Sequence, residues 1–210
     1  FILRTWTVSD DCNNASTQTQ TIVVRDTLGP VLLGIPADTT VECNAIPPTA
    51  VVTTNDNCDT NPITVVPSST NTKLPGSCDN EYFINRFWTA TDGCGNVSTG
   101  TQIITVIDTT GPTILGVPID TTVSCDAIPS SLTLNATDNC DTNPITVVAT
   151  DAAPTAGTCT GEYEFIRSYT ASDDCGNVTT ITQTISVIDT VGPTILGVPI
   201  DTTVSCDAIP

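Results

Sequence analysis

The chain has 210 residues, of which 23 are acidic and 5 basic, for a formal net charge of −18 at pH 7. Because nucleic acid and anionic membrane surfaces bind clustered Lys and Arg, this charge balance excludes both as partners. The chain contains ten Cys but no His, so it also lacks the commonest general base and the commonest transition-metal ligand.

Short runs bounded by Pro, Gly, Asn and Asp predict β-strands along the chain. Between residues 111 and 191 these runs are, in order, P-T-I-L-G-V-P, D-T-T-V-S-C, S-L-T-L-N-A-T-D-N-C, P-I-T-V-V-A-T, E-Y-E-F-I-R-S-Y-T-A-S-D-D and N-V-T-T-I-T-Q-T-I-S-V-I-D. No window has a convincing helical period, and 42 residues are the β-branched Thr, which favours strands. Six or seven short strands in about 80 residues are typical of an immunoglobulin-like Greek-key β-sandwich. We therefore predict an all-β chain of tandem Ig-like sandwiches.

A period of 81 or 82 residues runs through the chain. The segment V-I-D-T-T-G-P-T-I-L-G-V-P-I-D-T-T-V-S-C-D-A-I-P from Val106 returns from Val187 with one change, and a looser copy begins at Arg25. The cysteines keep the same period, since 125 − 43 = 82 and 206 − 125 = 81, and form four classes per unit. Cutting at Gly-Pro predicts complete repeats at 29–110 and 111–191. We expect 1–28 and 192–210 to be the C-terminal and N-terminal parts of truncated repeats, and the chain to be a window from a longer array.

The cysteines are expected to form structural disulfides, because a repeat of this size has a marginal core and no Cys pair has zinc or thioredoxin spacing. Disulfides imply an oxidising, extracellular setting. Loops of the predicted sandwich alternate between its two ends, which places the first and third cysteines of a repeat at one end and the second and fourth at the other. Of three possible connectivities, this favours two disulfides per repeat: Cys43–Cys78, Cys58–Cys94, Cys125–Cys159 and Cys140–Cys175. The partners of Cys12 and Cys206, which belong to truncated repeats, are expected to lie outside the chain.

Acidic side chains gather at one predicted end of each repeat, in two loops and in the linker that arrives from the preceding repeat. Oxygen ligands from several segments are what Ca²⁺ needs, and such a site would stiffen the joint. The competing interpretation is that Asp and Asn form turns there. The predicted calcium ligands are Asp108, Asp138, Asp141 and Asp173 at one joint, and Asp26, Asp56, Asp59 and Asp92 at the preceding joint, where Gly93 replaces one acid.

An Arg recurs two residues before an aromatic residue in the long strand of each repeat. The pairs are Arg4 with Trp6, Arg86 with Trp88, and Arg167 with Tyr169. One interpretation is a ligand-binding Arg, for instance for a sugar acid. The other, which we favour, is an ion pair or aromatic stack that lets the guanidinium lie against the core.

Three segments of the chain resemble parts of a known repeat. They are T-D-G-C-G-N-V-S from Thr91, S-D-D-C-G-N-V-T from Ser172 and I-D-T-T-G-P from Ile107. The unit resembles the hyalin repeat and related bacterial Ig-like repeats, and its Cys-rich and Thr-rich form is similar to arrays in giant surface proteins of the Bacteroidota, including gliding-motility adhesins. The resemblance implies an extracellular, cell-surface sandwich used for adhesion or as a stalk. It brings no catalytic residues with it.

Two glycosylation patterns also occur. Asp-Thr followed by an aliphatic residue or Thr looks like the O-glycosylation acceptor of secreted Bacteroidota proteins, and it predicts sites at Thr27, Thr39, Thr109, Thr121, Thr190 and Thr202. The N-glycosylation pattern occurs at Asn14, Asn96, Asn135 and Asn177. The competing interpretation is that Asp-Thr opens a turn or a strand.

No catalytic set is present in the sequence, so we do not expect an enzyme. The leading hypothesis is a stalk or fibre segment of a long extracellular adhesin that bears load and displays a distal tip. Its expected partners are neighbouring repeats, like chains in a fibre, and surface or glycan ligands at the tip, with no membrane insertion of this segment. The alternatives are a glycan-binding array, which needs Trp88 and Tyr169 exposed, and a filament joined by strand exchange.

Overall fold

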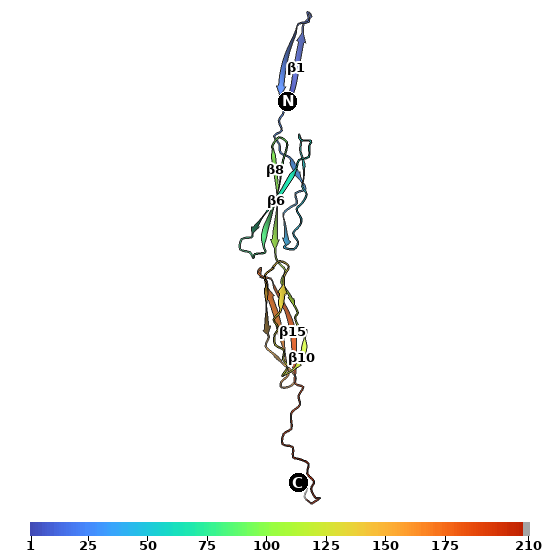
Figure 1. Cartoon of the computed structure of the whole chain (residues 1–210), viewed down its shortest axis with the longest axis vertical. Coiled ribbons are helices and arrows are strands. Elements are labelled where there is room, and N and C mark those ends of the chain that lie inside the picture. Colours follow the sequence, from blue (N-terminus) through green and yellow to red (C-terminus); the bar gives the residue numbers. More distant parts are fainter. Residues whose placement is uncertain (208–210) are drawn as a thin grey trace. The chain divides into compact units, whose positions relative to one another are not determined.

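The computed structural model describes residues 1–207, and all regular secondary structure among them is β-strand. The chain separates into two compact units (Figure 1). The first unit comprises Phe1–Thr110 together with two short loops, Asp138–Thr142 and Asp174–Asn177. The second comprises Gly111–Thr137, Asn143–Asp173 and the chain from Val178 onward. No described segment forms a helix long and apolar enough to cross a membrane.

The first unit contains a hairpin and a sandwich. Strands β1 (Ile2–Ser9) and β2 (Ala15–Ile22) form the antiparallel hairpin. A four-stranded sheet then has the order β4 (Thr39–Glu42), β8 (Val97–Ile107), β7 (Tyr82–Thr91) and β6 (Val65–Lys73), in which only β4 and β8 are parallel. Strands β3 (Val31–Leu33) and β5 (Thr53–Asn55) pair with each other, and Leu32 of β3 packs over Gly100 of β8. The smaller pair therefore covers a face of the larger sheet.

The second unit repeats this arrangement one period later. Its strand order is β10 (Thr121–Ser124), β15 (Val178–Ile188), β14 (Tyr163–Ser172), β12 (Ile145–Asp151), β11 (Asn135–Thr137) and β9 (Thr113–Leu115), and β13 (Thr155–Ala156) pairs with β14. Ile114 of β9 packs with Tyr169 and Ala171 of β14, so β9 lies over the face of the long strands. The predicted all-β, Ig-like sandwich fold is confirmed, and each sandwich is built from strands of its own repeat.

The cores follow the alternation of the long strands. On β7 the buried residues include Ile84, Trp88 and Ala90, and on β14 they include Phe165 and Tyr169. Successive side chains of a strand point to opposite faces, so the intervening residues face outward. Each core is small, and the remaining polar positions on the inner faces need specific partners.

The Gly-Pro at the start of each complete repeat is a packing feature. Pro30 and Pro112 are fully buried. A Cβ on Gly111 would lie 2.8 Å from Oγ1 of Thr179, and one on Gly29 would lie 2.6 Å from Oγ of Ser98. Glycine is therefore required here because the chain passes tightly over the start of the last strand of its own repeat.

Candidate functional site

Two disulfides join consecutive repeats of the sequence. Cys43 bonds Cys140 and Cys78 bonds Cys175, each across 97 residues. The predicted pairs Cys43–Cys78, Cys58–Cys94, Cys125–Cys159 and Cys140–Cys175 are therefore wrong. The free thiols among the described residues are Cys12, Cys58, Cys94, Cys125, Cys159 and Cys206.

Sheet order explains why the first and third cysteines of a repeat do not bond. Cys43 directly follows β4 at one edge of the four-stranded sheet, whereas Cys78 lies in the loop between β6 and β7 at the other edge. Neighbouring strands are about 4.8 Å apart, so positions two or three strands apart are separated by roughly 10 to 15 Å. A disulfide needs a Cα separation below about 7 Å. The two observed bridges have Cα separations of 5.7 and 4.9 Å.

An aspartate two residues earlier fixes the backbone at the loop cysteines. Oδ1 of Asp138 accepts hydrogen bonds from the N–H groups of Cys140 (2.8 Å) and Asp141 (3.1 Å). Asp56 does the same for Cys58 at 2.9 Å. These side chains therefore build the turn that presents the sulfur, as the competing interpretation of the acidic loops expects.

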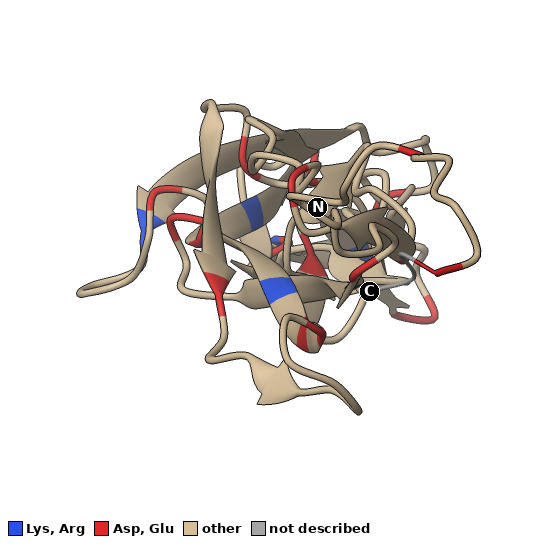
Figure 2. Ribbon diagram, turned by 90° about the horizontal axis from the view of Figure 1, so that it is seen from below, with Lys and Arg blue, Asp and Glu red and all other residues tan. Residues whose placement is uncertain are grey.

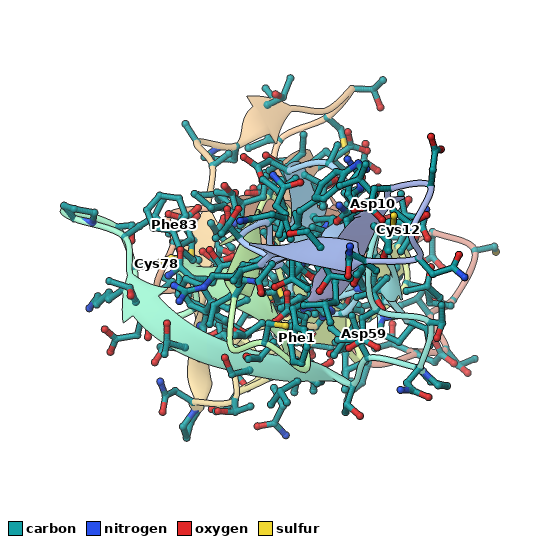
Figure 3. The ribbon with its side chains drawn as sticks, turned by 90° about the horizontal axis from the view of Figure 1, so that it is seen from above. Phe1, Asp10, Cys12, Asp59, Cys78 and Phe83 are labelled. Carbon is teal, nitrogen blue, oxygen red and sulfur yellow. A yellow bond between two sulfur atoms is a disulfide. The ribbon has the colours of Figure 1, made fainter. Side chains whose placement is uncertain are left out.

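The loop between the two long strands uses the same device. Oδ1 of Asp92 accepts from the N–H groups of Cys94 (2.9 Å) and Asn96 (2.8 Å). In the hairpin, Asp10 accepts from Cys12 at 3.0 Å, and Figure 3 labels both residues at the turn. The residue after this cysteine has a positive φ, and it is Gly95 or Gly176 in the complete repeats and Asn13, which tolerates that conformation, in the hairpin.

Three of the predicted calcium ligands in the first unit come together. Asp26, Asp56 and Asp92 each offer one carboxylate oxygen, and these oxygens lie within 4.8 Å of one another. Asp92 is buried, the other two are half-buried, and Oδ2 of Asp56 is buried with no hydrogen-bond partner among the described residues. Figure 2 shows how many acidic residues lie in loops beside only a few basic ones. Close carboxylate oxygens and an unsatisfied one are the hard donors that suit Ca²⁺.

The fourth predicted ligand, Asp59, is not part of this cluster. Its Oδ2 accepts a hydrogen bond from the N–H of Gly93 at 3.0 Å, and its Oδ1 accepts one from the N–H of Asn61 at 3.1 Å. Asp59 therefore braces the loop after β5 against the loop after β7. It supports the cluster from outside.

The repeat counterparts of the cluster are Asp108 and Asp138 in the first unit and Asp173 in the second. Oδ2 of Asp138 is buried with no hydrogen-bond partner among the described residues, as at Asp56. Oδ1 of Asp108 accepts from the N–H of Thr110 at 3.2 Å, and Asp141, the counterpart of Asp59, is buried. The buried carboxylate oxygen without a hydrogen-bond partner among the described residues thus occurs at the same position in both repeats, at Asp56 and at Asp138.

Glu42 is an acidic neighbour that the sequence did not single out. One of its carboxylate oxygens lies within 4.8 Å of Asp108 and of Sγ of Cys140. That sulfur is bonded to Cys43 and is therefore no thiolate ligand. Glu42 accepts a hydrogen bond from Oγ1 of Thr109. No repeated signal identifies it, because Ser124 and Ser205 occupy its position in the following repeats.

Electrostatics distinguishes the carboxylates from the thiols. Burial is the largest single influence on the pKa of Asp92 and raises it, but the hydrogen bonds from Asn96, Cys94 and Gly95 together hold it below its ordinary value. Burial also raises the pKa of the Cys58 thiol, and the charges of Asp26 and Asp56 raise it further. At neutral pH the site therefore combines an ionised Asp92 carboxylate with a protonated Cys58 thiol, and a protonated thiol is a poorer nucleophile than a thiolate.

The repeated Arg is a structural residue in both complete repeats. Arg86 is 6% exposed and donates a hydrogen bond to the carbonyl of Pro48 at 2.9 Å and another to that of Pro47. Arg167 is 4% exposed, binds both carboxylate oxygens of Asp151 at 2.7 and 2.9 Å, and lies 5.7 Å from the ring centroid of Phe165. The contacts of Arg167 are the ion pair and aromatic stack that we favoured, whereas Arg86 is held by hydrogen bonds to backbone carbonyl groups.

The Arg167–Asp151 pair predicts a pH-dependent stability of the second unit. Hydrogen bonding to Arg167 lowers the pKa of Asp151 in the folded state, so the pair stabilises the fold above the ordinary aspartate pKa of about 3.9. That contribution is lost as the pH falls through the lower, folded-state pKa. We expect the protection of the β14 amides against exchange, taken relative to their intrinsic exchange rates at each pH, to fall over this acidic range, and to depend less on pH in Asp151→Asn. An unchanged pH profile in the variant would contradict the assignment.

The aromatic residues beside these Arg are buried in the complete repeats. Trp88 is 1% exposed and Tyr169 is 0% exposed. Nε1 of Trp88 donates to the carbonyl of Ala50 at 3.3 Å. Arg4 and Trp6 lie exposed on the hairpin strand β1. Trp88 and Tyr169 are therefore inaccessible to a glycan.

The predicted glycosylation residues differ in accessibility. Thr27, Thr109, Thr190 and Thr202 are exposed, whereas Thr39 and Thr121 begin β4 and β10 and are half-buried. Asn135 is exposed on β11. Nδ2 of Asn14, Asn96 and Asn177 donates hydrogen bonds to Asp10, Asp92 and the carbonyl of Asp108 respectively. These amides hold turns, and glycosylation at all the sites stays a prediction.

No protein-family model and no curated protein matches the chain. Among solved structures, it is similar to mouse protocadherin-24 EC1-3, with 16% identity, 90% of this chain and 79% of that chain covered, and a TM-score of 0.37. It is also similar to human protocadherin-24 EC1-2 Form II, with 13% identity, 79% of this chain and 100% of that chain covered, and a TM-score of 0.32. A third similar structure is Drosophila N-cadherin EC1-4, with 16% identity, 87% of this chain and 56% of that chain covered, and a TM-score of 0.29. These identities and scores do not establish a family.

Proposed function

We propose that this chain is a structural segment of an extracellular repeat protein, a stalk or fibre that bears load and displays a distal adhesive tip. The observation that carries the proposal is the pair of disulfides between consecutive repeats. Disulfides persist in oxidising, extracellular settings. Cross-links that run from repeat to repeat maintain the connection even when a sandwich opens, which is what a load-bearing segment requires.

The net charge and the buried aromatic residues support the same proposal. A formal charge of −18 keeps exposed chains soluble and apart. Burial of Trp88 and Tyr169 removes the best candidates for a glycan platform. The strands of each sandwich come from one repeat, so nothing in the described chain favours strand exchange. Surface or glycan ligands thus belong to a tip, and the partners of this segment are neighbouring repeats and like chains.

Electron microscopy of intact cells that make the protein tests its location and role. Gold-labelled antibody against this chain is expected on the cell exterior, displaced from the envelope. Removal of surface proteins by a protease is expected to abolish both the label and adhesion of the cells. Label confined to the cell interior, or adhesion that survives loss of the label, would overturn the proposal.

We also propose that the aspartate cluster binds Ca²⁺ and stiffens the loops that present the cysteines. Asp26, Asp56 and Asp92 would hold the ion in the first unit. Calcium would supply positive charge to neighbouring carboxylates and satisfy Oδ2 of Asp56, which has no hydrogen-bond partner among the described residues. Asp59 keeps its role as a brace.

Titration calorimetry with CaCl₂ tests this site in the whole chain. Asp56→Asn keeps Oδ1 as a turn acceptor but removes the charge, so we expect affinity at this site to fall at least about tenfold, or about 1.4 kcal/mol. Asp201→Asn, which changes an exposed residue by the same charge, is the control and is expected to bind normally. Equal loss in both variants, or no binding by the parent chain, would refute a specific calcium site.

A further inference from the structure

The two disulfides obey one rule in terms of cysteine class. Numbered by order within a repeat, the first class is Cys43, Cys125 and Cys206, the second is Cys58 and Cys140, the third is Cys78 and Cys159, and the fourth is Cys12, Cys94 and Cys175. The observed bridges join first to second class and third to fourth class. In each bridge the first partner belongs to one repeat and the second to the repeat that follows. No bridge among the described residues lies within a repeat.

This rule accounts for every free thiol among the described residues. Cys58, Cys94 and Cys12 are of the second and fourth classes, so each requires a first- or third-class cysteine of a preceding repeat. Cys125, Cys159 and Cys206 are of the first and third classes, so each requires a second- or fourth-class cysteine of a following repeat. None of these six partner positions occurs in the sequence. The six thiols are also the ones that are free in the structure.

The free second-class loop already has the conformation of the bonded one. The N–H of Cys58 donates to Oδ1 of Asp56 at 2.9 Å, and that of the bonded Cys140 donates to Asp138 at 2.8 Å. All six free cysteines are exposed. The hydrogen bond that shapes the receiving loop is thus present without the bridge as well as with it.

We infer that each repeat is a covalent connector with two different ends. Cys125 and Cys159 form a binding surface for the second- and fourth-class loops of a further repeat, and Cys58 and Cys94 form the complementary surface for the first- and third-class cysteines of another. The partner is a repeat with the D-N-C-D and D-x-C-G-N loops of this sequence. Every joint of an array then carries two disulfides, and all four cysteines of a repeat bond outside it. This inference does not rest on the proposed load-bearing role.

The chemistry of each joint is an exchange with a small-molecule disulfide such as glutathione disulfide. One cysteine thiolate attacks it, forms a mixed disulfide and releases one glutathione thiolate, which takes up a proton. The second cysteine of the pair then attacks the protein sulfur of the mixed disulfide and releases the other glutathione. Two protein thiols are oxidised, and one glutathione disulfide is reduced to two glutathione thiols.

A chain lengthened by one repeat tests the inference. Residues 1–191 joined to a second copy of 111–210 contain 14 cysteines and three complete repeats in phase. After refolding with glutathione disulfide, alkylation and peptide mapping of the unreduced chain should show four bridges and six alkylated thiols. The new bridges should join Cys125 and Cys159 to the second-copy counterparts of Cys140 and Cys175. Six bridges with two free thiols would indicate bridges within repeats, and two bridges with ten free thiols would indicate no pairing at the new joint; either overturns the inference.

The parent chain provides an independent test if the lengthened chain does not fold. In Cys140→Ser we expect Cys43 to become alkylated while Cys78–Cys175 stays intact, because the rule gives Cys43 no other partner. Cys206→Ser is the matched control, since it removes a thiol that is free in the structure and should leave both bridges unchanged. A Cys43–Cys78 or Cys43–Cys58 bridge in Cys140→Ser would overturn the rule.

Discussion

Pulled by its two ends, the oxidised chain is expected to extend to a contour length 97 residues shorter than the reduced chain. Each bridge spans 97 residues, and force cannot extend the enclosed chain until the bridge is broken. At about 3.3 to 3.6 Å per extended residue, the difference is roughly 320 to 350 Å. Single-molecule force spectroscopy with and without a reducing agent measures it directly.

Cysteine variants sharpen this prediction. Cys43→Ser leaves the Cys78–Cys175 bridge, which spans the same number of residues, so the single variant should retain the whole shortening. Cys43→Ser combined with Cys78→Ser should extend under oxidising conditions as far as the reduced parent. A shortening that halves in the single variant, or persists in the double variant, would show that other pairs form.

Trp88→Ala is expected to destabilise the first sandwich by about 3 to 5 kcal/mol. Trp88 is 1% exposed and donates a hydrogen bond to the carbonyl of Ala50, so its removal leaves a cavity and an unpaired carbonyl. Hydrogen exchange of the β7 and β8 amides under native conditions measures the loss locally. A local measurement is needed because a chain of several units does not unfold in one step.

Trp6→Ala is the matched control, because Trp6 occupies the same repeat position on β1 and is 53% exposed. Its effect on the exchange of β7 and β8 should be below about 0.5 kcal/mol. Equal effects of the two substitutions would contradict the placement of Trp88 in the core. Retained stability in Trp88→Ala would do the same.

The strand pattern could be predicted because strand periodicity is a local property. Alternation along the strand places Ile84, Arg86 and Trp88 on one face, and the structure buries all three. The disulfide pairing could not be predicted in this way. Alternation of loops within one repeat places Cys43 and Cys78 at the same end, but it gives neither the distance between the sheet edges nor the position of loops from the adjoining repeat.

Three of the four acidic residues predicted to cluster in the first unit do so, and the fourth does not, because position in a loop does not fix which way a side chain points. Position in a loop identifies Asp26, Asp56 and Asp92, since turn residues and metal ligands share this signal. Asp59 carries the same signal but bonds the backbone of Gly93, and only the path of the neighbouring loop decides this. Glu42 is not repeated in the following repeats, so the period of the sequence could not predict the hydrogen bond that it accepts from the Thr109 hydroxyl.

The equal spans of the two disulfides have a consequence for how stress divides between them. The bridges close a ring with two arms: one runs from Cys43 to Cys78 and the other from Cys140 to Cys175. Each arm is 35 residues long, since 78 − 43 and 175 − 140 are equal. Once both sandwiches have opened, the two arms become taut at the same extension. Each sulfur–sulfur bond then carries about half of the tension, so neither bond is loaded more heavily than the other.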